Sequence, residues 1–292
     1  MYLVYQFDVN DDPVMLSKTL WRLKISHKIT MNKNQNELWL SDPSHQATTL
    51  QLIQTWKDDP QALLRVNLNR NQEPNHSRGL MSQFRSAPAT VIIILAALIV
   101  AAITQLDSDV MKIRYFTISP LEVIGNQVRF YPLSELMTKG EYWRFFSPAL
   151  LHFSVMHIVF NVLWVWDVGR RLERIVGSSL WLLGVSLIAI VSNVLQFEIT
   201  GNPLFGGLSG VVYGLIGFAW LMPILNRQWP TIIRKPLMIF FMVWLVVGYT
   251  PLTEMIGLGS IANTAHTIGL ASGLVLSLVY WFVAKIRSYK NV

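Results

Sequence analysis

The 292-residue chain contains no cysteine, so it can form neither a disulfide nor a thiolate metal site, and cysteine usage says nothing of its redox compartment. Charged residues are also scarce. They make up 14% of the chain, whereas soluble domains carry roughly a quarter. Hydrophobic residues make up 52% and the mean hydropathy is +0.39. This balance indicates a membrane protein.

The first residues lack the basic region and long apolar core of a cleaved signal peptide, and none is expected. The net charge is +7. Lysines and arginines cluster beside apolar segments, which favours anionic lipid headgroups over nucleic acid as their partner. We therefore expect membrane lipids as partners and no nucleic acid.

Residues 1–68 have the pattern of a small soluble domain. Its expected elements are a strand over 2–7, a helix over 11–25, a hairpin formed by 27–31 and 37–40, and a helix over 41–57. This order predicts a βαββα, α+β domain. Residues 69–87 are polar without periodicity and are predicted to be a linker.

Six apolar segments follow, each close to the ~20 residues that a spanning helix needs. They cover residues 88–106, 151–168, 178–197, 208–225, 232–249 and 261–284. A long aromatic stretch with proline turns, 107–150, separates the first from the second. We predict an α-helical integral membrane protein with six transmembrane helices over 88–284 and a basic tail over 285–292.

The distribution of positive charge predicts the orientation. Lysine and arginine occur in the connections between segments two and three and between four and five, and in the tail, but not in the third-to-fourth and fifth-to-sixth connections. Since positive charge stays in the cytoplasm, both termini are expected there, with 107–150 outside.

A serine and a histidine stand out among the apolar segments, where polar groups are costly and indicate function. Ser209 follows a glycine pair at the start of the fourth segment, where helix N–H groups can stabilise an oxyanion. His266 lies in the sixth segment, close to Gly269 and Gly273, which suit tight helix contact. If that contact is with the fourth segment, His266 can take the serine proton. The alternatives are a packing turn and a hydrogen-bonded packing histidine.

His157 and Asn161 are four residues apart, so they share one face of the second segment. Asn161 can donate two N–H bonds to an oxyanion, and bonding between helices is the alternative. A zinc site is disfavoured because the obvious carboxylates lie elsewhere. Tyr213, one turn after Ser209, can pack on the imidazole or simply in the core. No acid is placed to complete a triad, so a Ser-His dyad is expected.

Four motifs together carry a family resemblance. They are Trp143-Arg144, HFSVMHIVFN (152–161), GGLSGVVYG (206–214) and ANTAHTIGL (262–270). In this order the chain resembles the rhomboid intramembrane serine proteases, of the bacterial GlpG kind. The resemblance covers about 88–284, and the βαββα domain also looks like the small cytoplasmic domain of that subgroup.

The resemblance implies a role for each residue. Ser209 would be the nucleophile and His266 its general base, with Tyr213 stacked on His266. The oxyanion site would be formed by His157, Asn161, Gly207 and the Ser209 backbone N–H.

Other expectations from the resemblance concern the frame of the site. Trp143 and Arg144 would belong to an external structural loop, and Glu173 matches the family's acid after the second span. Residues 240–244 and the loop before the sixth span would form a lateral gate and cap. Asp167 departs from the pattern, which has an aromatic there, and is expected to pair with Arg170 and Arg171.

The resemblance further implies a location and partners. The enzyme would lie in the bacterial inner membrane, need no cofactor or metal, and cleave transmembrane protein substrates through an acyl-enzyme. A weak homodimer is left open.

Two other functions are weighed against the protease. One is a non-catalytic relative that binds transmembrane segments. The other is a small transporter, which is disfavoured because no inverted repeat is found. The soluble domain shows no catalytic constellation, and its basic side chains suit lipid headgroups or a solvated surface. They are Lys18, Arg22, Lys24 and Lys28.

Overall fold

The computed structural model describes residues 2–32, 35–65, 80–106, 109–124, 127–255 and 261–290. The chain divides into two compact units. The first contains Met1–Gln83 with Met222–Thr231, and the second contains Phe84–Leu221 with Ile232–Val292. Each unit has its own architecture.

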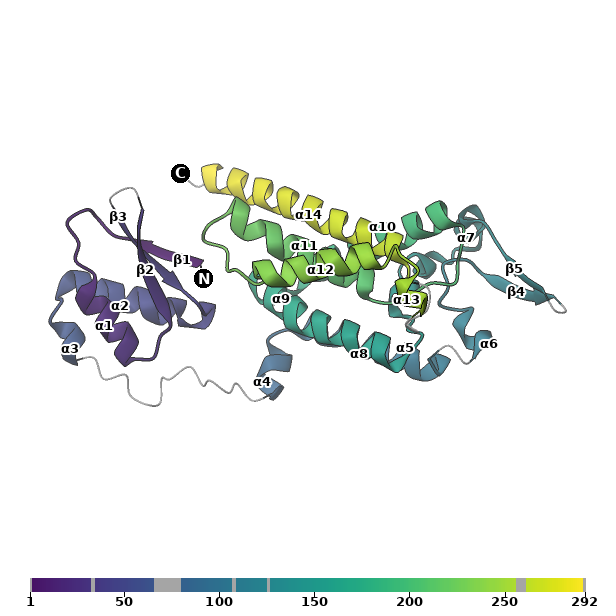
Figure 1. Ribbon diagram of the computed structural model, residues 1–292, viewed down its shortest axis with the longest axis horizontal. Coiled ribbons are helices and arrows are strands. Elements are labelled where there is room, and N and C mark those ends of the chain that lie inside the picture. Colours follow the sequence, from purple (N-terminus) through teal and green to yellow (C-terminus); the bar gives the residue numbers. More distant parts are fainter. Residues whose placement is uncertain are drawn as a thin grey trace. The chain divides into compact units, whose positions relative to one another are not determined.

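The first unit is a three-stranded antiparallel sheet covered by helices (Figure 1). Its main elements are β1 (Tyr2–Gln6), α1 (Val14–Arg22), β2 (His27–Asn32), β3 (Gln35–Leu40) and α2 (Gln46–Asp58). The strand order is β1-β3-β2. Leu16 and Leu20 of α1 pack with Leu38 and Leu40 of β3 in one apolar core. The element order agrees with the βαββα pattern expected from the sequence, and two short helices are added, η1 (Pro43–His45) and α3 (Ala62–Arg65).

Glu37 is a buried acid of the first unit. Glu37 of β3 accepts hydrogen bonds from the side chains of Gln6 and Asn32 and pairs with Arg227, whose guanidinium lies 3.0 Å away. Although burial raises the pKa of Glu37, these hydrogen bonds and the arginine outweigh it and lower the pKa below its ordinary value. The carboxylate is therefore stable inside this small domain.

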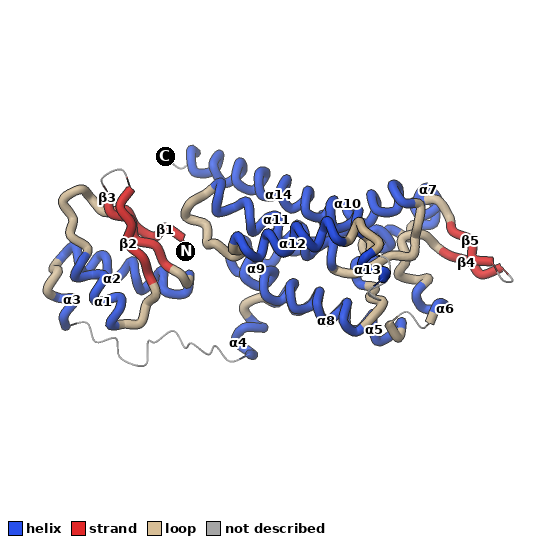
Figure 2. Tube along the Cα trace, in the orientation of Figure 1, coloured by secondary structure: helices blue, strands red, loops and turns tan. Residues whose placement is uncertain are grey.

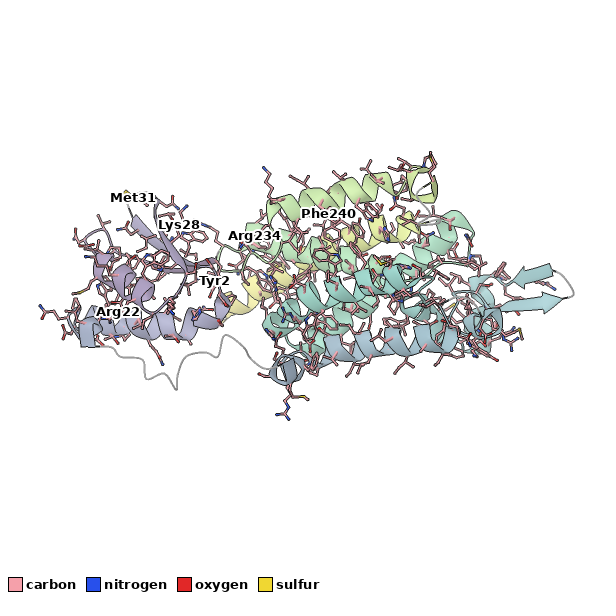
Figure 3. All side chains as sticks on the ribbon, turned by 60° about the horizontal axis from the view of Figure 1, so that its bottom comes forward. Tyr2, Arg22, Lys28, Met31, Arg234 and Phe240 are labelled. Atoms are coloured by element: carbon pink, nitrogen blue, oxygen red, sulfur yellow. The ribbon has the colours of Figure 1, made fainter. Side chains whose placement is uncertain are left out.

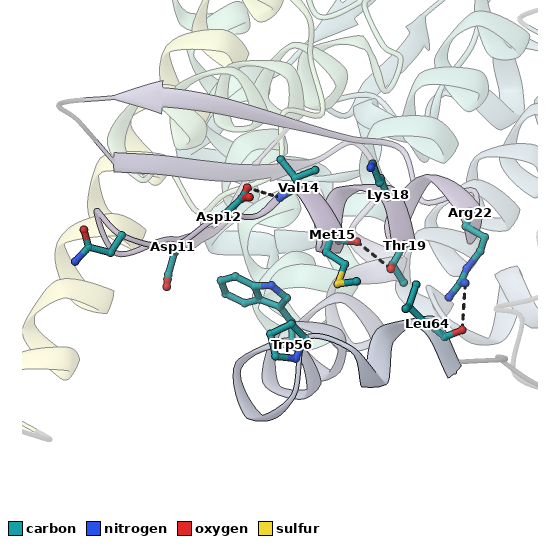
Figure 4. Close-up of a pocket in the computed structure, with 11 residues that line it drawn as sticks. Asp11, Asp12, Val14, Met15, Lys18, Thr19, Arg22, Trp56 and Leu64 are labelled. Atoms are coloured by element: carbon teal, nitrogen blue, oxygen red, sulfur yellow. Dashed lines mark hydrogen bonds between the residues drawn. The ribbon is translucent and has the colours of Figure 1, made fainter.

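The first unit also has a hollow of about 620 Å³ beside α1 (Figure 4). Asp11, Asp12, Lys18 and Arg22 lie around it. The Arg22 guanidinium already donates to the carbonyl groups of residues 63 and 64. Its described lining contains no histidine and mixes both signs of charge, so the hollow indicates no chemistry of its own.

Most of the second unit is helical (Figure 2). Its longer helical elements are α5 (Pro88–Thr104), α8 (Val155–Trp164), the π-helical segment η5 (Val165–Gly169), α9 (Arg170–Val176), α10 (Ser178–Thr200), α11 (Ser209–Leu225, whose last residues are grouped with the first unit), α12 (Lys235–Val247) and α14 (Asn263–Lys290). Helix α14 packs along α10 and also contacts α12. Phe240 lies on α12 with its ring about half exposed (Figure 3).

Within the described part of the chain, two helices are long and apolar enough to cross a membrane, Ser178–Thr200 and Asn263–Ile286. Three others are apolar but shorter, Pro88–Thr104, Ser209–Leu225 and Lys235–Val247. The second predicted span begins at residue 151, whereas the helix begins at Val155 and runs through η5 and α9 to Val176. The helical character is therefore clear, and the count of six spans stays a prediction.

Part of the predicted linker is helical. Residues 66–79 lie outside the described part of the chain, but Leu80–Arg85 forms helix α4. The ring of Phe84 packs edge-on against Trp166 at 5.2 Å between centroids. This contact between residues distant in sequence therefore stabilises α4, where the local sequence pattern predicted only a linker.

The predicted external segment, 107–150, has structure that its sequence did not reveal. It contains α6 (Val110–Ile113), a hairpin of β4 (Leu121–Ile124) and β5 (Gln127–Phe130), α7 (Leu133–Lys139), and the short turns η3 (Tyr142–Phe145) and η4 (Ser147–Leu150). The hairpin projects from one end of the helical unit (Figure 1). A further short helix, α13 (Leu252–Met255), follows α12.

Arg144 holds this segment together. It is 4% exposed and donates to the Glu141 carboxylate at 2.6 Å and to the carbonyl groups of Arg114 and Thr117. Trp143 donates from its indole to the carbonyl of Tyr115, while its ring stays about half exposed. The Trp143-Arg144 pair thus joins η3 to the loop that follows α6, about thirty positions earlier in sequence.

Two carboxylates near the end of the second predicted span behave differently. Glu173 is 2% exposed and accepts from the N–H groups of Ala89 and Thr90 and from the hydroxyls of Thr90 and Ser178. It therefore ties α9 to the starts of α5 and α10. Asp167 is more exposed and pairs with Arg171 at 2.6 Å and Arg170 at 3.7 Å, as expected from its neighbours.

Candidate active site

Ser209 is the first residue of α11. The turn before it contains Gly207 with φ +115°, a backbone conformation that favours glycine. The first N–H groups of a helix have no partner within that helix, so the Ser209 side chain sits beside free donors and a partial positive charge. The Ser209 Oγ lies 2.7 Å from His266 Nε2. The two residues are 57 positions apart in sequence and belong to different helices.

Glycines bring these two helices together. A Cβ on Gly269 of α14 would overlap the carbonyl of Gly210 on α11. One turn further, a Cβ on Gly273 would overlap the carbonyl of Gly214. The backbones touch along this line because no side chain separates them. The Gly269 and Gly273 pair noted in the sequence therefore faces α11, which brings His266 within reach of Ser209.

His266 is held on three sides. It is 5% exposed, and the Tyr213 ring stacks on its imidazole at 4.8 Å between centroids and 24° between planes. Tyr213 in turn donates its hydroxyl to the carbonyl of Phe241 on α12. The His266 Nδ1 lies 3.2 Å from the Asn263 Oδ1. The imidazole is therefore held by residues of α11 and of its own helix, and Tyr213 is held in turn by α12.

Asn263 is a residue that the sequence reasoning did not single out. An asparagine that opens a helix is usually a cap, and that local role hides any other. The signal that could have found it is its spacing, since a residue three positions before a histidine lies on the same helical face.

On the other side of Ser209, His157 and Asn161 line the turn. Both lie on α8, which begins with a hydrogen bond from the His157 N–H to the Ser154 hydroxyl. A Cβ on Gly207 would lie 2.6 Å from His157 Nε2 and 3.4 Å from Asn161 Nδ2. Asn161 is 1% exposed, and its Nδ2 has no hydrogen-bond partner among the described residues. A buried donor without a partner is costly, and a site that receives negative charge would explain it.

Gly207 lines this site without donating to it. Its N–H already donates to the Pro148 carbonyl at 2.9 Å. The next N–H, of Leu208, points to His152 Nε2 at 3.4 Å. The absence of a side chain is therefore what Gly207 contributes, and the buried donor without a partner among the described residues here is Asn161 Nδ2.

The predicted frame residues lie apart from this pair. Arg144 is buried in the 107–150 segment, and Glu173 ties the ends of α5, α9 and α10. The loop predicted to cap the site falls partly at residues 256–260, outside the described residues. Within the described residues, no group of three or more histidine, aspartate or glutamate side chains could hold a metal.

One comparison with known families bears on these observations. The family model for the Rhomboid domain matches residues 139–282. The matched region runs from the last residue of α7 into α14 and includes His157, Asn161, Ser209 and His266. Residues 139–282 are therefore a Rhomboid domain, and this part of the chain belongs to the rhomboid family, which implies a membrane protein with intramembrane serine protease activity.

Proposed function

We propose that this chain is an endopeptidase that hydrolyses peptide bonds within or next to transmembrane helices of membrane proteins, using Ser209 and His266. The observation that carries the proposal is the 2.7 Å hydrogen bond between Ser209 Oγ and His266 Nε2, made between two helices of the Rhomboid domain. Such a pair is the minimal arrangement of an activated serine nucleophile.

The first half of the reaction forms an acyl-enzyme. Ser209 Oγ attacks the substrate carbonyl carbon, and its proton passes to His266 Nε2. The carbonyl oxygen becomes an oxyanion, which accepts hydrogen bonds from Asn161 Nδ2, from His157 and from the backbone N–H of Ser209. When the tetrahedral intermediate collapses, the bond to nitrogen breaks and His266 returns the proton to the leaving amine.

The second half uses water. A water molecule gives a proton to His266 Nε2 as its oxygen attacks the acyl carbon. The bond to Ser209 Oγ then breaks, the new carboxyl product leaves, and Ser209 regains its proton. Helical backbone carbonyls are already hydrogen bonded, so the substrate helix must unwind at the cleaved bond. The Asn161 donor supports this proposal, because its Nδ2 is buried without a hydrogen-bond partner among the described residues.

We further propose six spans, with both termini in the cytoplasm of a bacterial inner membrane, as in the GlpG kind. Support comes from the five apolar helices and from the arginines that flank them. Helix α12 would form the lateral gate, since Phe240 presents its ring outward and stacks along Trp244 at 6.5 Å. The substrates would be transmembrane proteins, with lipids as surroundings and a weak homodimer as one arrangement.

Purified protein and a fluorescently labelled transmembrane substrate test the proposal. Ser209→Ala and His266→Ala should each abolish cleavage, whereas Ser277→Ala should leave it unchanged. Ser277 is the matched control, because it is a buried serine of α14 whose hydroxyl donates only to a backbone carbonyl. A fluorophosphonate should label the wild type but not Ser209→Ala. Cleavage retained by both active-site variants would refute the proposal. Binding without turnover would instead identify a non-catalytic relative.

A further inference from the structure

Asn263 connects the proposed base to a different helix. It is buried at the start of α14, and its Oδ1 lies 3.2 Å from His266 Nδ1. Its Nδ2 donates to the carbonyl of Leu245 on α12 at 2.8 Å. A continuous line of hydrogen bonds therefore runs from α12 through Asn263 and the imidazole to Ser209.

The Leu245 carbonyl fixes which group donates and which accepts in each of these hydrogen bonds. A backbone carbonyl can only accept, so the amide nitrogen of Asn263 must face Leu245 and the amide oxygen must face the imidazole. An amide oxygen can also only accept, so a neutral His266 must carry its proton on Nδ1. Its Nε2 then presents a lone pair to the Ser209 hydroxyl, which is the tautomer that can remove the serine proton.

Space for the Asn263 amide depends on Gly248. A Cβ built on Gly248 would lie 2.5 Å from the Asn263 Oδ1, closer than real contacts allow. The φ of Gly248 is −61°, so alanine suits the backbone there and only the amide would be displaced. Gly248 thus offers a way to move Asn263 without altering it.

We propose that Asn263 is a positioning residue that fixes the tautomer and ring orientation of His266 from the end of α12. The inference rests on the proposed function, because it concerns the base of that reaction. It adds a third side chain to the Ser-His pair. The orientation of His266 then also depends on the position of α12, the helix proposed as the gate. If the Leu245 carbonyl moved, the Asn263 amide would lose the hydrogen bond that holds it.

A purely structural role gives a different result. Leu245 lies near the end of α12, where helix carbonyls lack partners within the helix, so the Asn263 amide also caps α12. A cap affects the unfolding temperature. Orientation of the base affects kcat at temperatures where the protein is fully folded. KM should change little, because substrate binding does not depend on the hydrogen bond between Asn263 and His266.

Five variants separate these roles, with cleavage of a labelled transmembrane substrate, fluorophosphonate labelling rate and Tm as readouts. Asn263→Ala should lower kcat and labelling at least about tenfold with KM within about twofold. Gly248→Ala should lower kcat similarly. In the double variant, Gly248→Ala should add no further loss, because no amide is left to displace. Gly184→Ala is the matched control, since a Cβ there meets nothing closer than 4.0 Å.

Asn263→Asp is the fifth variant and tests rescue. It keeps an oxygen acceptor for His266 Nδ1 but loses the donor to the Leu245 carbonyl, so its kcat should lie between those of Asn263→Ala and the wild type. The acid limb of its pH–rate profile should move to higher pH than in the wild type, because a carboxylate favours the protonated imidazole.

Each alternative has its own signature. A wild-type kcat in Asn263→Ala with a lowered Tm would show that Asn263 only caps α12. A loss from Gly248→Ala that persists in the Asn263→Ala background would show that the glycine acts by another route. Either result overturns the inference and leaves the proposed function standing. A wild-type protein that neither cleaves substrate nor reacts with the fluorophosphonate would overturn both.

Discussion

Replacing Glu173 by glutamine should destabilise the helical unit far more than replacing a neighbouring exposed acid. Glu173 Oε1 accepts from the Ala89 N–H and the Ser178 hydroxyl, and Oε2 accepts from the Thr90 N–H and hydroxyl. All four distances lie between 2.6 and 2.9 Å. The carboxylate therefore satisfies the first two N–H groups after the start of α5 together with two hydroxyls.

The size of the effect follows from what glutamine cannot do. Its amide nitrogen would face one of the two backbone N–H groups, and a buried donor without an acceptor costs about 1–3 kcal/mol. The hydroxyls can turn round and accept, so they lose little. Losing the negative charge at a helix N-terminus costs about another 0.3–1 kcal/mol, or more where buried. We expect a total of about 2–4 kcal/mol.

Thermal unfolding in detergent checks this number. For units of this size each 1 kcal/mol lowers Tm by about 2–4 °C, so Glu173→Gln should lower Tm by about 5–15 °C. Asp167→Asn is the matched control. It removes an exposed ion pair with Arg171, worth about 0–1 kcal/mol, and should lower Tm by no more than about 4 °C. Equal Tm values for wild type and Glu173→Gln, or equal losses in both variants, would show that the carboxylate is not a structural tie.

Gly207→Ala should lower kcat by at least about a hundredfold in a folded protein, because its Cβ would meet His157 Nε2 at 2.6 Å and displace the oxyanion donors; full activity in the substrate assay would contradict this. Arg144→Lys should lower Tm by several degrees, because an ammonium cannot reproduce the guanidinium's hydrogen bonds to one carboxylate and two carbonyls. An unchanged Tm would show that these hydrogen bonds do not stabilise the segment. Glu37 has a pKa below its ordinary value of 4.5, so its contribution to stability is present above that pH and lost as pH falls. The protection factors of β2 and β3 against hydrogen exchange in the whole protein should therefore fall as the pH drops below 4.5, and Glu37→Gln should remove that part of the pH dependence.

Apolar periodicity predicted the parts of the fold that depend on local pattern. The starts of the fourth and sixth helices agree with their predicted spans to within two residues, at Ser209 and Asn263. The 107–150 segment was left without elements, because its hairpin and short turns are held by contacts distant in sequence. Arg144 reaches a carbonyl thirty positions earlier, and no local pattern encodes such a bond. The same reason explains α4, where Phe84 contacts Trp166.

The residues of the candidate site could be predicted where they are polar side chains within apolar segments. Ser209 and His266 could be picked out because polar side chains are costly in apolar segments. Asn263 could not, since an asparagine that opens a helix already has an ordinary explanation. Gly207 was expected to join the oxyanion site, but the hydrogen bond from its N–H to Pro148 depends on how two distant turns pack.

Hydrogen-bond partners divide the candidate site into two halves. On the side of His266, the polar atoms of the line are paired, from the Leu245 carbonyl through Asn263 to the Ser209 hydroxyl. On the side of α8, the Asn161 Nδ2 is buried with no partner among the described residues. A line of paired groups fixes which atom carries each proton, whereas an unpaired donor can stabilise negative charge that forms during a reaction. Packing alone would favour partners on both sides, because an empty donor is costly in an apolar setting. The asymmetry therefore supports the proposed reaction at Ser209, which needs proton removal on one side and oxyanion stabilisation on the other.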